Sequence, residues 1–153
     1  MGPEIHHRIE SGQQLACLVW RHPSRLAIAS GPLGGGLGNR HWVLNAQVES
    51  AYDRDDPGIH LSEVAGHLAL DGEGVGLMTA VDVTWVCHAA DAGVEVWATV
   101  GVESPAWAAA PEQVVWHQPI PGTINIMVEV PVRLSEAALA RAVRQAVSSG
   151  LRR

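Results

Sequence analysis

Three segments of the 153-residue chain alternate aliphatic or aromatic side chains with other residues at every second position. They are "HWVLNAQVE" (41–49), "GVEVWATVGV" (93–102) and "GTINIMVEV" (122–130). Successive side chains of a strand point to opposite faces, so this period of two predicts β-strands with one buried face. The faces expected in the core hold these residues: Trp42, Leu44, Ala46 and Val48; Val94, Val96, Ala98, Val100 and Val102; Ile124, Ile126, Val128 and Val130.

Further strands are expected over 15–20 and 25–30, and two or three within 75–102, whereas two segments favour helices. Residues 60–70 place Leu61, Val64, Ala65 and Leu68 at helical spacing. Ser135 is suited to cap a helix over 136–147, whose apolar stripe is Leu139, Val143, Ala146 and Val147. Strands outnumber helices and do not alternate with them one to one. We therefore predict an α+β fold: a single domain over 1–153, with a largely antiparallel or mixed β-sheet and two main helices packed on it.

Charge and composition exclude several partners. The net charge is −6, and the ten basic residues, all arginine, are scattered along the chain, so we expect no nucleic-acid partner. No apolar run approaches the length needed to cross a bilayer, and the N-terminus lacks the pattern of a signal peptide. Two cysteines do not make a disulfide framework. These features predict a cytoplasmic protein without a membrane partner.

The glycine-rich stretch "GPLGGGLGNR" (31–40) is predicted to be a loop. It does not fit a dinucleotide fingerprint, because counting from Gly34 the sixth position is Asn39, and a P-loop needs a lysine that the chain lacks. Two interpretations stay open. Gly34, Gly35 and Gly36 form either a tight turn or a backbone cradle for a ligand.

Other reactive residues are tested and set aside. No G-x-S-x-G nucleophile motif occurs. Cys87 and His88 are neighbours on a predicted strand and point to opposite faces. His60, Glu63 and His67 share a helical face, but the spacing is not that of a zinc motif and no fourth ligand is evident, so we expect a solvated face and no metal site.

Asp82 interrupts the apolar segment "MTAVDVTWV" (78–86), where a buried carboxylate needs a partner. Its alternative is an outward-facing residue of a one-sided strand. The acidic run of Asp53, Asp55 and Asp56 precedes a helix start, where carboxylates favour turns and complement the helix dipole.

Short polar side chains recur on the second face of the predicted strands. Asn45, Thr99, Thr123 and Asn125 are amides or hydroxyls where an ordinary wet face favours long charged chains. If these strands are neighbours, the four residues present fixed donors and acceptors. Such a patch suits an amide-rich ligand or a developing oxyanion.

The same segments resemble the adenosylcobinamide amidohydrolase (CbiZ) family. The resemblance runs from about residue 30 to 147 in ordered blocks: "GGGLGNRHWVLNAQV", "YDRDDP", "VGLMTAVDV", "ATVGVESPAWAA", "GTINIMVEV" and "LSEAAL". It implies hydrolysis of the amide that joins aminopropanol to a corrin side chain of adenosylcobinamide, which yields adenosylcobyric acid and aminopropanol in cobinamide salvage. A non-catalytic corrinoid-binding protein is the alternative. No cofactor is expected, since the corrinoid is the substrate, and a homo-oligomer stays open.

Amide hydrolysis needs an activated nucleophile, donors to the oxyanion and an acid for the leaving amine. We hypothesise that Asp82 activates water, that Asn45 and Asn125 bind the oxyanion or the side-chain amide, and that Thr79 and Thr123 orient water or substrate. Asp55 is the reserve carboxylate. The rival hypothesis makes Thr79 or Thr123 a nucleophile.

A corrinoid is large and edged with amides, so its site is expected to combine apolar surface with hydrogen-bonding groups. Trp42, Trp97 and Trp107 lie within the resembling blocks and are candidates to cover the ring. Core packing is the alternative for each of them. Gly34, Gly35 and Gly36 would let the backbone approach the substrate closely.

Overall fold

The computed structural model describes residues 2–101 and 123–150, with side chains up to 145. It confirms an α+β fold with a mixed sheet of four strands, an antiparallel sheet of three and two α-helices. The elements are β1 (Glu4–Glu10), β2 (Gln13–Ala29), β3 (Gly36–Gln47), α1 (Pro57–His67), β4 (Gly74–Thr79), the 3₁₀ turn η1 (Val83–Trp85), β5 (Cys87–Asp91), β6 (Val94–Val100), β7 (Ile124–Glu129) and α2 (Glu136–Gly150). Among the described residues, no helix is long and apolar enough to cross a membrane.

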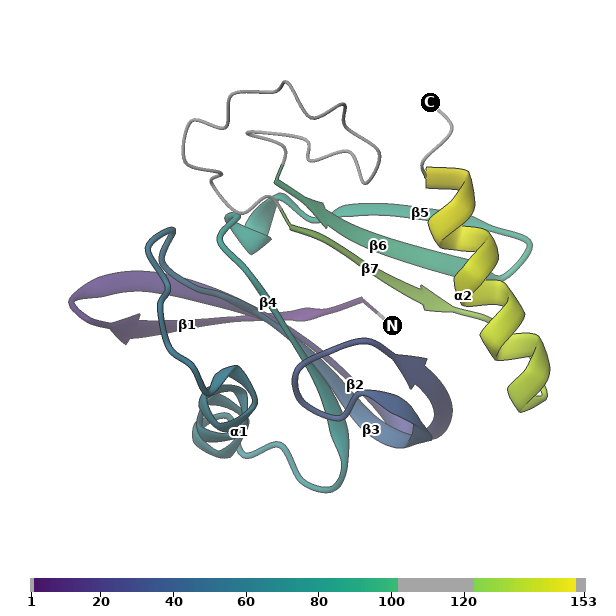
Figure 1. Ribbon diagram of the computed structural model, residues 1–153, viewed down its shortest axis with the longest axis horizontal. Coiled ribbons are helices and arrows are strands. Elements are labelled where there is room, and N and C mark those ends of the chain that lie inside the picture. The colour runs from purple at the N-terminus through teal and green to yellow at the C-terminus, as the bar shows by residue number, and fades with distance from the viewer. Residues whose placement is uncertain (1, 102–122, 151–153) are drawn as a thin grey trace.

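The first sheet has the strand order β1-β2-β3-β4 and the second β5-β6-β7. β3 and β4 are parallel, joined by a crossover that contains α1, whereas all other pairs are antiparallel. α1 and the second sheet lie on opposite sides of the first sheet (Figure 1). The first sheet is therefore the middle of three layers.

Each face of the first sheet has its own apolar core. Between it and α1 lie Cys17, Val19, Trp42, Leu44, Ala46, Leu61, Val64, Ala65 and Leu70. Between the two sheets lie Ala16, Leu18, Trp20, Val83 and Trp97. Because both faces are covered, all six residues from Leu15 to Trp20 on β2 are buried without alternation.

The second sheet buries the face opposite to the one predicted. Val100, Ile124, Ile126 and Val128 are between 45% and 56% exposed. The face that packs on the first sheet instead carries Trp97, Thr99, Asn125 and Met127. Packing Trp97 and Met127 against the first sheet buries a large apolar area, and the polar side chains beside them are hydrogen-bonded. The alternation is confirmed, but the assignment of its buried face is wrong.

Three element boundaries also differ from the prediction. β2 is one strand from Gln13 to Ala29 in place of the two predicted over 15–20 and 25–30, with a register shift between Arg21 and Arg25. Only the first half of the glycine-rich stretch is a loop, since β3 begins at Gly36 and pairs with the second half of β2. No element is predicted over 4–10, which forms β1 at the edge of the first sheet.

The C-terminal helix begins as predicted. The Ser135 hydroxyl accepts a hydrogen bond from the Ala138 amide at 3.3 Å, which caps α2. α2 contacts β2, and Leu139 is half-buried, whereas Val143 is 42% exposed, contrary to the stripe predicted for it. The side chains of Ala146 and Val147 lie outside the described residues.

The β5–β6 hairpin turns on Ala92 and Gly93, whose φ angles are +47° and +80°. A left-handed alanine is strained, whereas asparagine tolerates this conformation and Asn-Gly favours such turns. We expect Ala92→Asn to raise the free energy of unfolding by about 0.5–1 kcal/mol, measured by chemical denaturation. Ala92→Val should lower it, and equal stabilities of the two variants would contradict the explanation.

Candidate active site

The parallel strands β3 and β4 end at the same edge of the first sheet. Their last residues, Gln47 and Thr79, are register partners, and the Val48 amide donates to the Thr79 carbonyl at 2.9 Å. We call this end of the pair the carboxyl edge. β7 reaches it from the second sheet, because the Asn125 side chain donates to the carbonyl of Met78 at 2.9 Å. In α/β sheets, ligands bind beyond the carboxyl ends of parallel strands, so this edge is the candidate site.

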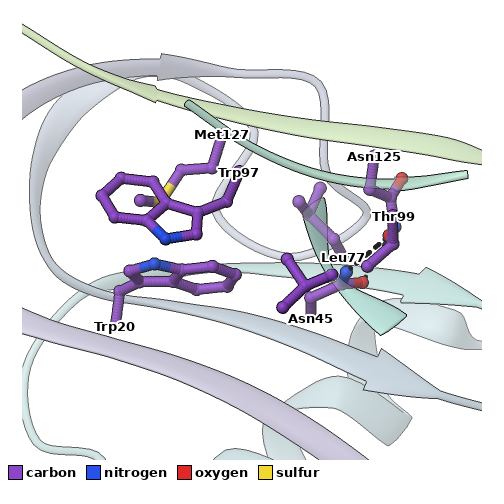
Figure 2. Close-up of a pocket in the computed structure, with 8 residues that line it drawn as sticks. Trp20, Asn45, Leu77, Trp97, Thr99, Asn125 and Met127 are labelled. Atoms are coloured by element: carbon purple, nitrogen blue, oxygen red, sulfur yellow. Dashed lines mark hydrogen bonds between the residues drawn. The ribbon is translucent and has the colours of Figure 1, made fainter. Parts of the chain in front are cut away.

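Asn45, Thr99 and Asn125 form a hydrogen-bonded amide cluster between the two sheets (Figure 2). Asn45 Nδ2 donates to Thr99 Oγ1 at 3.0 Å, and Asn125 Nδ2 donates to Asn45 Oδ1 at 2.9 Å. Asn45 and Thr99 are 3% and 2% exposed. The structure thus brings together three of the four residues predicted to share a polar patch.

The amide cluster borders a cavity of about 10 Å³, which is close to the room needed by one water molecule. Trp20 and Trp97 also line it, and Trp20 Nε1 is buried without a hydrogen-bond partner among the described residues. The cavity is far too small for a corrinoid. The cluster therefore supports the carboxyl edge from beneath and does not enclose a large ligand.

The two threonines have different surroundings at the carboxyl edge. Thr79 is 1% exposed, and its hydroxyl accepts a hydrogen bond from the Val81 amide at 3.2 Å. This burial favours a role in shaping the turn after β4 over the rival role of a nucleophile. Thr123 is half-buried, and its carbonyl accepts from the Gly101 amide at 3.0 Å, so it lies where β6 and β7 meet.

Asp82 lies three residues beyond the carboxyl edge and is exposed. The prediction that it interrupts a strand is wrong, because β4 ends at Thr79 and Asp82 is the cap of η1. Its Oδ1 accepts from the amide of Thr84 at 2.9 Å and from the hydroxyl at 2.7 Å. Val83, fully buried in the core, follows it directly. The turn thus holds a solvent-facing carboxylate in a fixed place.

A comparison with models of protein families matches the chain to adenosylcobinamide amidohydrolase over residues 2–148. The chain belongs to this family. No significant match was found among curated proteins or among solved structures. The family name describes an amidohydrolase, so the carboxyl edge can be considered for amide chemistry.

The glycines predicted to contact the amidohydrolase substrate lie elsewhere. Gly34 and Trp42 line an open groove of about 490 Å³ together with Arg40. The first register pair of the parallel strands, Trp42 with Gly74, lies beside this groove, at the opposite end of the pair from the carboxyl edge. The structure therefore separates these residues from Asn45 and Asn125, and their contact with a corrinoid stays a prediction.

Packing explains the form of this glycine turn. Gly34 has φ +65°, and a Cβ there would collide with the Gly74 carbonyl, so only glycine fits. The buried Arg40 side chain donates to the Gly34 carbonyl from Nε at 3.1 Å and from Nη2 at 3.0 Å. The tight-turn interpretation thus has direct support for Gly34. Gly35 is exposed, and Gly36 starts β3 with φ +85°.

Two of the tryptophans predicted to bind the substrate are buried in the core. Trp97 is 3% exposed, packs edge to face on Trp20 with ring centroids 5.9 Å apart, and stacks on His88 at 4.9 Å. Trp42 is 5% exposed and donates from Nε1 to the Gly72 carbonyl at 3.1 Å. Both belong to the core. Asp55 is exposed between β3 and α1, and Trp107 lies outside the described residues.

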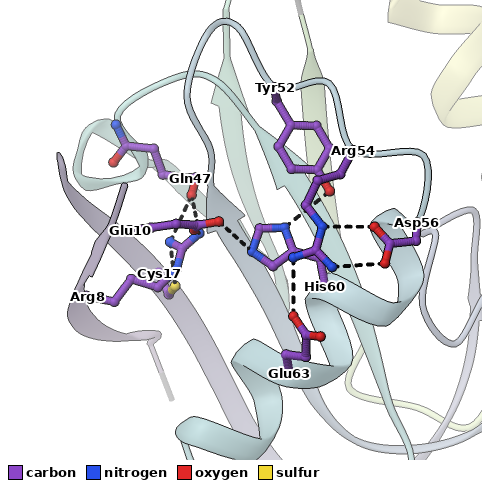
Figure 3. A network of polar contacts seen from close by, with 9 residues as sticks. All are labelled: Arg8, Glu10, Cys17, Gln47, Tyr52, Arg54, Asp56, His60 and Glu63. Atoms are coloured by element: carbon purple, nitrogen blue, oxygen red, sulfur yellow. Dashed lines mark hydrogen bonds and ion pairs between the residues drawn. The ribbon is translucent and has the colours of Figure 1, made fainter. Parts of the chain in front are cut away.

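Sequence reasoning missed one polar network of this protein, around His60 (Figure 3). His60 is 3% exposed, so the solvated face predicted for it is wrong, although Glu63 and His67 on the same helix are exposed. Its ring contacts Glu10 and Tyr52. No local pattern reveals these contacts, because Glu10 comes from β1, a strand without a clear alternation in the sequence. Within residues 2–101 and 123–145, no three His, Cys, Asp or Glu side chains are arranged to hold a metal ion.

Proposed function

We propose that the protein hydrolyses the amide between aminopropanol and the corrin side chain of adenosylcobinamide. The products are adenosylcobyric acid and aminopropanol, and the reaction serves cobinamide salvage for cobamide biosynthesis. The observation that carries the proposal is the family match over residues 2–148 of a 153-residue chain. The corrinoid is the substrate, and the proposal includes no separate cofactor or metal.

The proposed reaction takes place at the carboxyl edge. Asp82 accepts a proton from water as the water oxygen attacks the amide carbonyl, and its exposure lets a bulky substrate approach. Asn125 and Asn45 frame the site from beneath, where their hydrogen bonds to each other, to Thr99 and to the Met78 carbonyl hold the carboxyl edge in place. Thr123 and Thr79 accept backbone hydrogen bonds from Gly101 and Val81, which fix the chain around the site. When the C–N bond breaks, the departing nitrogen takes up a proton.

The decisive experiment incubates the purified protein with adenosylcobinamide and measures both products by liquid chromatography and mass spectrometry. We expect adenosylcobyric acid and aminopropanol in equal amounts, at a rate proportional to protein concentration. Heat-denatured protein is the control. Tight corrinoid binding without either product would replace the enzyme by a non-catalytic corrinoid-binding protein.

A further inference from the structure

A buried histidine of α1 is engaged on both ring nitrogens. His60 Nε2 lies 2.8 Å from Glu10 Oε1, and Nδ1 lies 3.1 Å from the Tyr52 hydroxyl. The Tyr52 and His60 rings are stacked, 12° from parallel, with centroids 5.6 Å apart. The Glu10 carboxylate, the His60 imidazole and the Tyr52 hydroxyl, in this spatial order, form a path along which a proton can move.

Glu10 is tied to the carboxyl edge through Arg8. Arg8 Nη2 contacts Glu10 Oε2 at 2.7 Å, while Nη1 and Nη2 donate to the carbonyl of Gln47 at 2.9 and 2.8 Å. Gln47 is the last residue of β3 and the register partner of Thr79. Arg8 therefore fixes the Glu10 carboxylate, which orients His60, to the backbone at the carboxyl edge. Asp82 follows this edge by three residues.

Tyr52 is a partly exposed end of this network, as Glu10 is at the other end. It lies four residues beyond Val48, and its amide donates to the Glu49 carbonyl at 3.1 Å, which turns the chain back directly after the carboxyl edge. Tyr52 is half-buried, whereas the His60 behind it is buried. Of the two rings, the phenol is therefore the more accessible to a substrate at the edge.

We propose that Tyr52 is the catalytic acid that protonates the leaving amine, with His60 and Glu10 as positioning residues. This inference rests on the proposed function, which needs such an acid and does not otherwise name one. Partial burial raises the pKa of the Tyr52 phenol, so the group is protonated at neutral pH and able to donate. No other tyrosine occurs in the chain.

The proton balance of the step is complete. The phenol proton moves to the amide nitrogen as the C–N bond breaks, and the phenolate oxygen regains a proton from solvent. His60 and Glu10 hold the phenol in place during this transfer. Asp82 releases to solvent the proton taken from the attacking water. One water is consumed for each amide cleaved.

The test is Tyr52→Phe, which removes the hydroxyl and keeps the ring stacked on His60. We expect kcat with adenosylcobinamide to fall about 100-fold or more, with KM changed less than about threefold, because general acids contribute about 10²–10⁴-fold. Glu10→Gln should also lower kcat with adenosylcobinamide. Glu63→Gln and His67→Gln, exposed on the same helix, are matched controls expected to retain full activity.

A second substrate separates an acid from a structural support. In the p-nitrophenyl ester of adenosylcobyric acid the leaving group departs without a proton, so the deficit of Tyr52→Phe should shrink to less than about threefold. An equal deficit on both substrates, or wild-type kcat of Tyr52→Phe on the amide, would overturn the inference while the proposed function stands. A wild-type protein that releases no aminopropanol would overturn both.

Discussion

Replacing Asp82 by asparagine is expected to lower kcat for aminopropanol release by about 10²–10⁴-fold, the usual contribution of a general base. Asparagine keeps an Oδ1 that can accept the two hydrogen bonds from Thr84, so the cap of η1 persists and only the proton acceptor is lost. The measurement is steady-state turnover of adenosylcobinamide, with circular dichroism to confirm folding.

The control for this variant is Asp91→Asn, which removes an exposed carboxylate at the end of β5, away from the carboxyl edge. It should retain full activity. Near-normal turnover of folded Asp82→Asn would remove Asp82 from the mechanism. A large loss in Asp55→Asn instead would transfer the role of base to the segment between β3 and α1.

Asn45→Ala is expected to lower the free energy of unfolding by about 2–4 kcal/mol. The buried Thr99 hydroxyl loses its donor, and the Asn125 amide loses one of its two acceptors. Each buried polar group left without a partner costs about 1–3 kcal/mol. Urea denaturation measures the difference.

Asn39→Ala on the same strand provides the comparison for this variant. Asn39 is exposed, so its replacement should change stability by less than about 0.5 kcal/mol. If the two variants were equally stable, the amide cluster would contribute nothing to joining the sheets. Loss of activity in Asn45→Ala without loss of stability would instead assign Asn45 directly to the reaction.

Side-chain periodicity predicts much of this fold because each strand repeats its environment every second residue. It locates the central residues of β3, β6 and β7, and capping chemistry places the start of α2 directly after Ser135. Periodicity does not determine which face meets a partner. In the second sheet, Trp97 and Met127 face inward among polar residues while Ile126 faces solvent. This outcome depends on partners in the first sheet, where Trp20 contacts Trp97 and Asn45 bonds the inward polar groups.

For the candidate site too, the sequence predicts some of the residues and does not reveal others. Unusual short amides identify Asn45 and Asn125, because such side chains are rare in strands without a partner. By contrast, the contact of His60 with Glu10 joins residues 50 positions apart through a strand with little local signal. The distance of the glycine turn from Asn125 likewise follows from parallel pairing of β3 with β4, which sequence periodicity does not reveal.

The order of the two sheets along the chain has a consequence for synthesis on the ribosome. All four strands of the first sheet lie within residues 4–79, so they are available for pairing before β6 and β7 have been made. Until those strands arrive, the face that carries Trp20 and Asn45 has no cover. The nascent chain therefore passes through a stage with a paired sheet and an open apolar face, the kind of surface that chaperones bind.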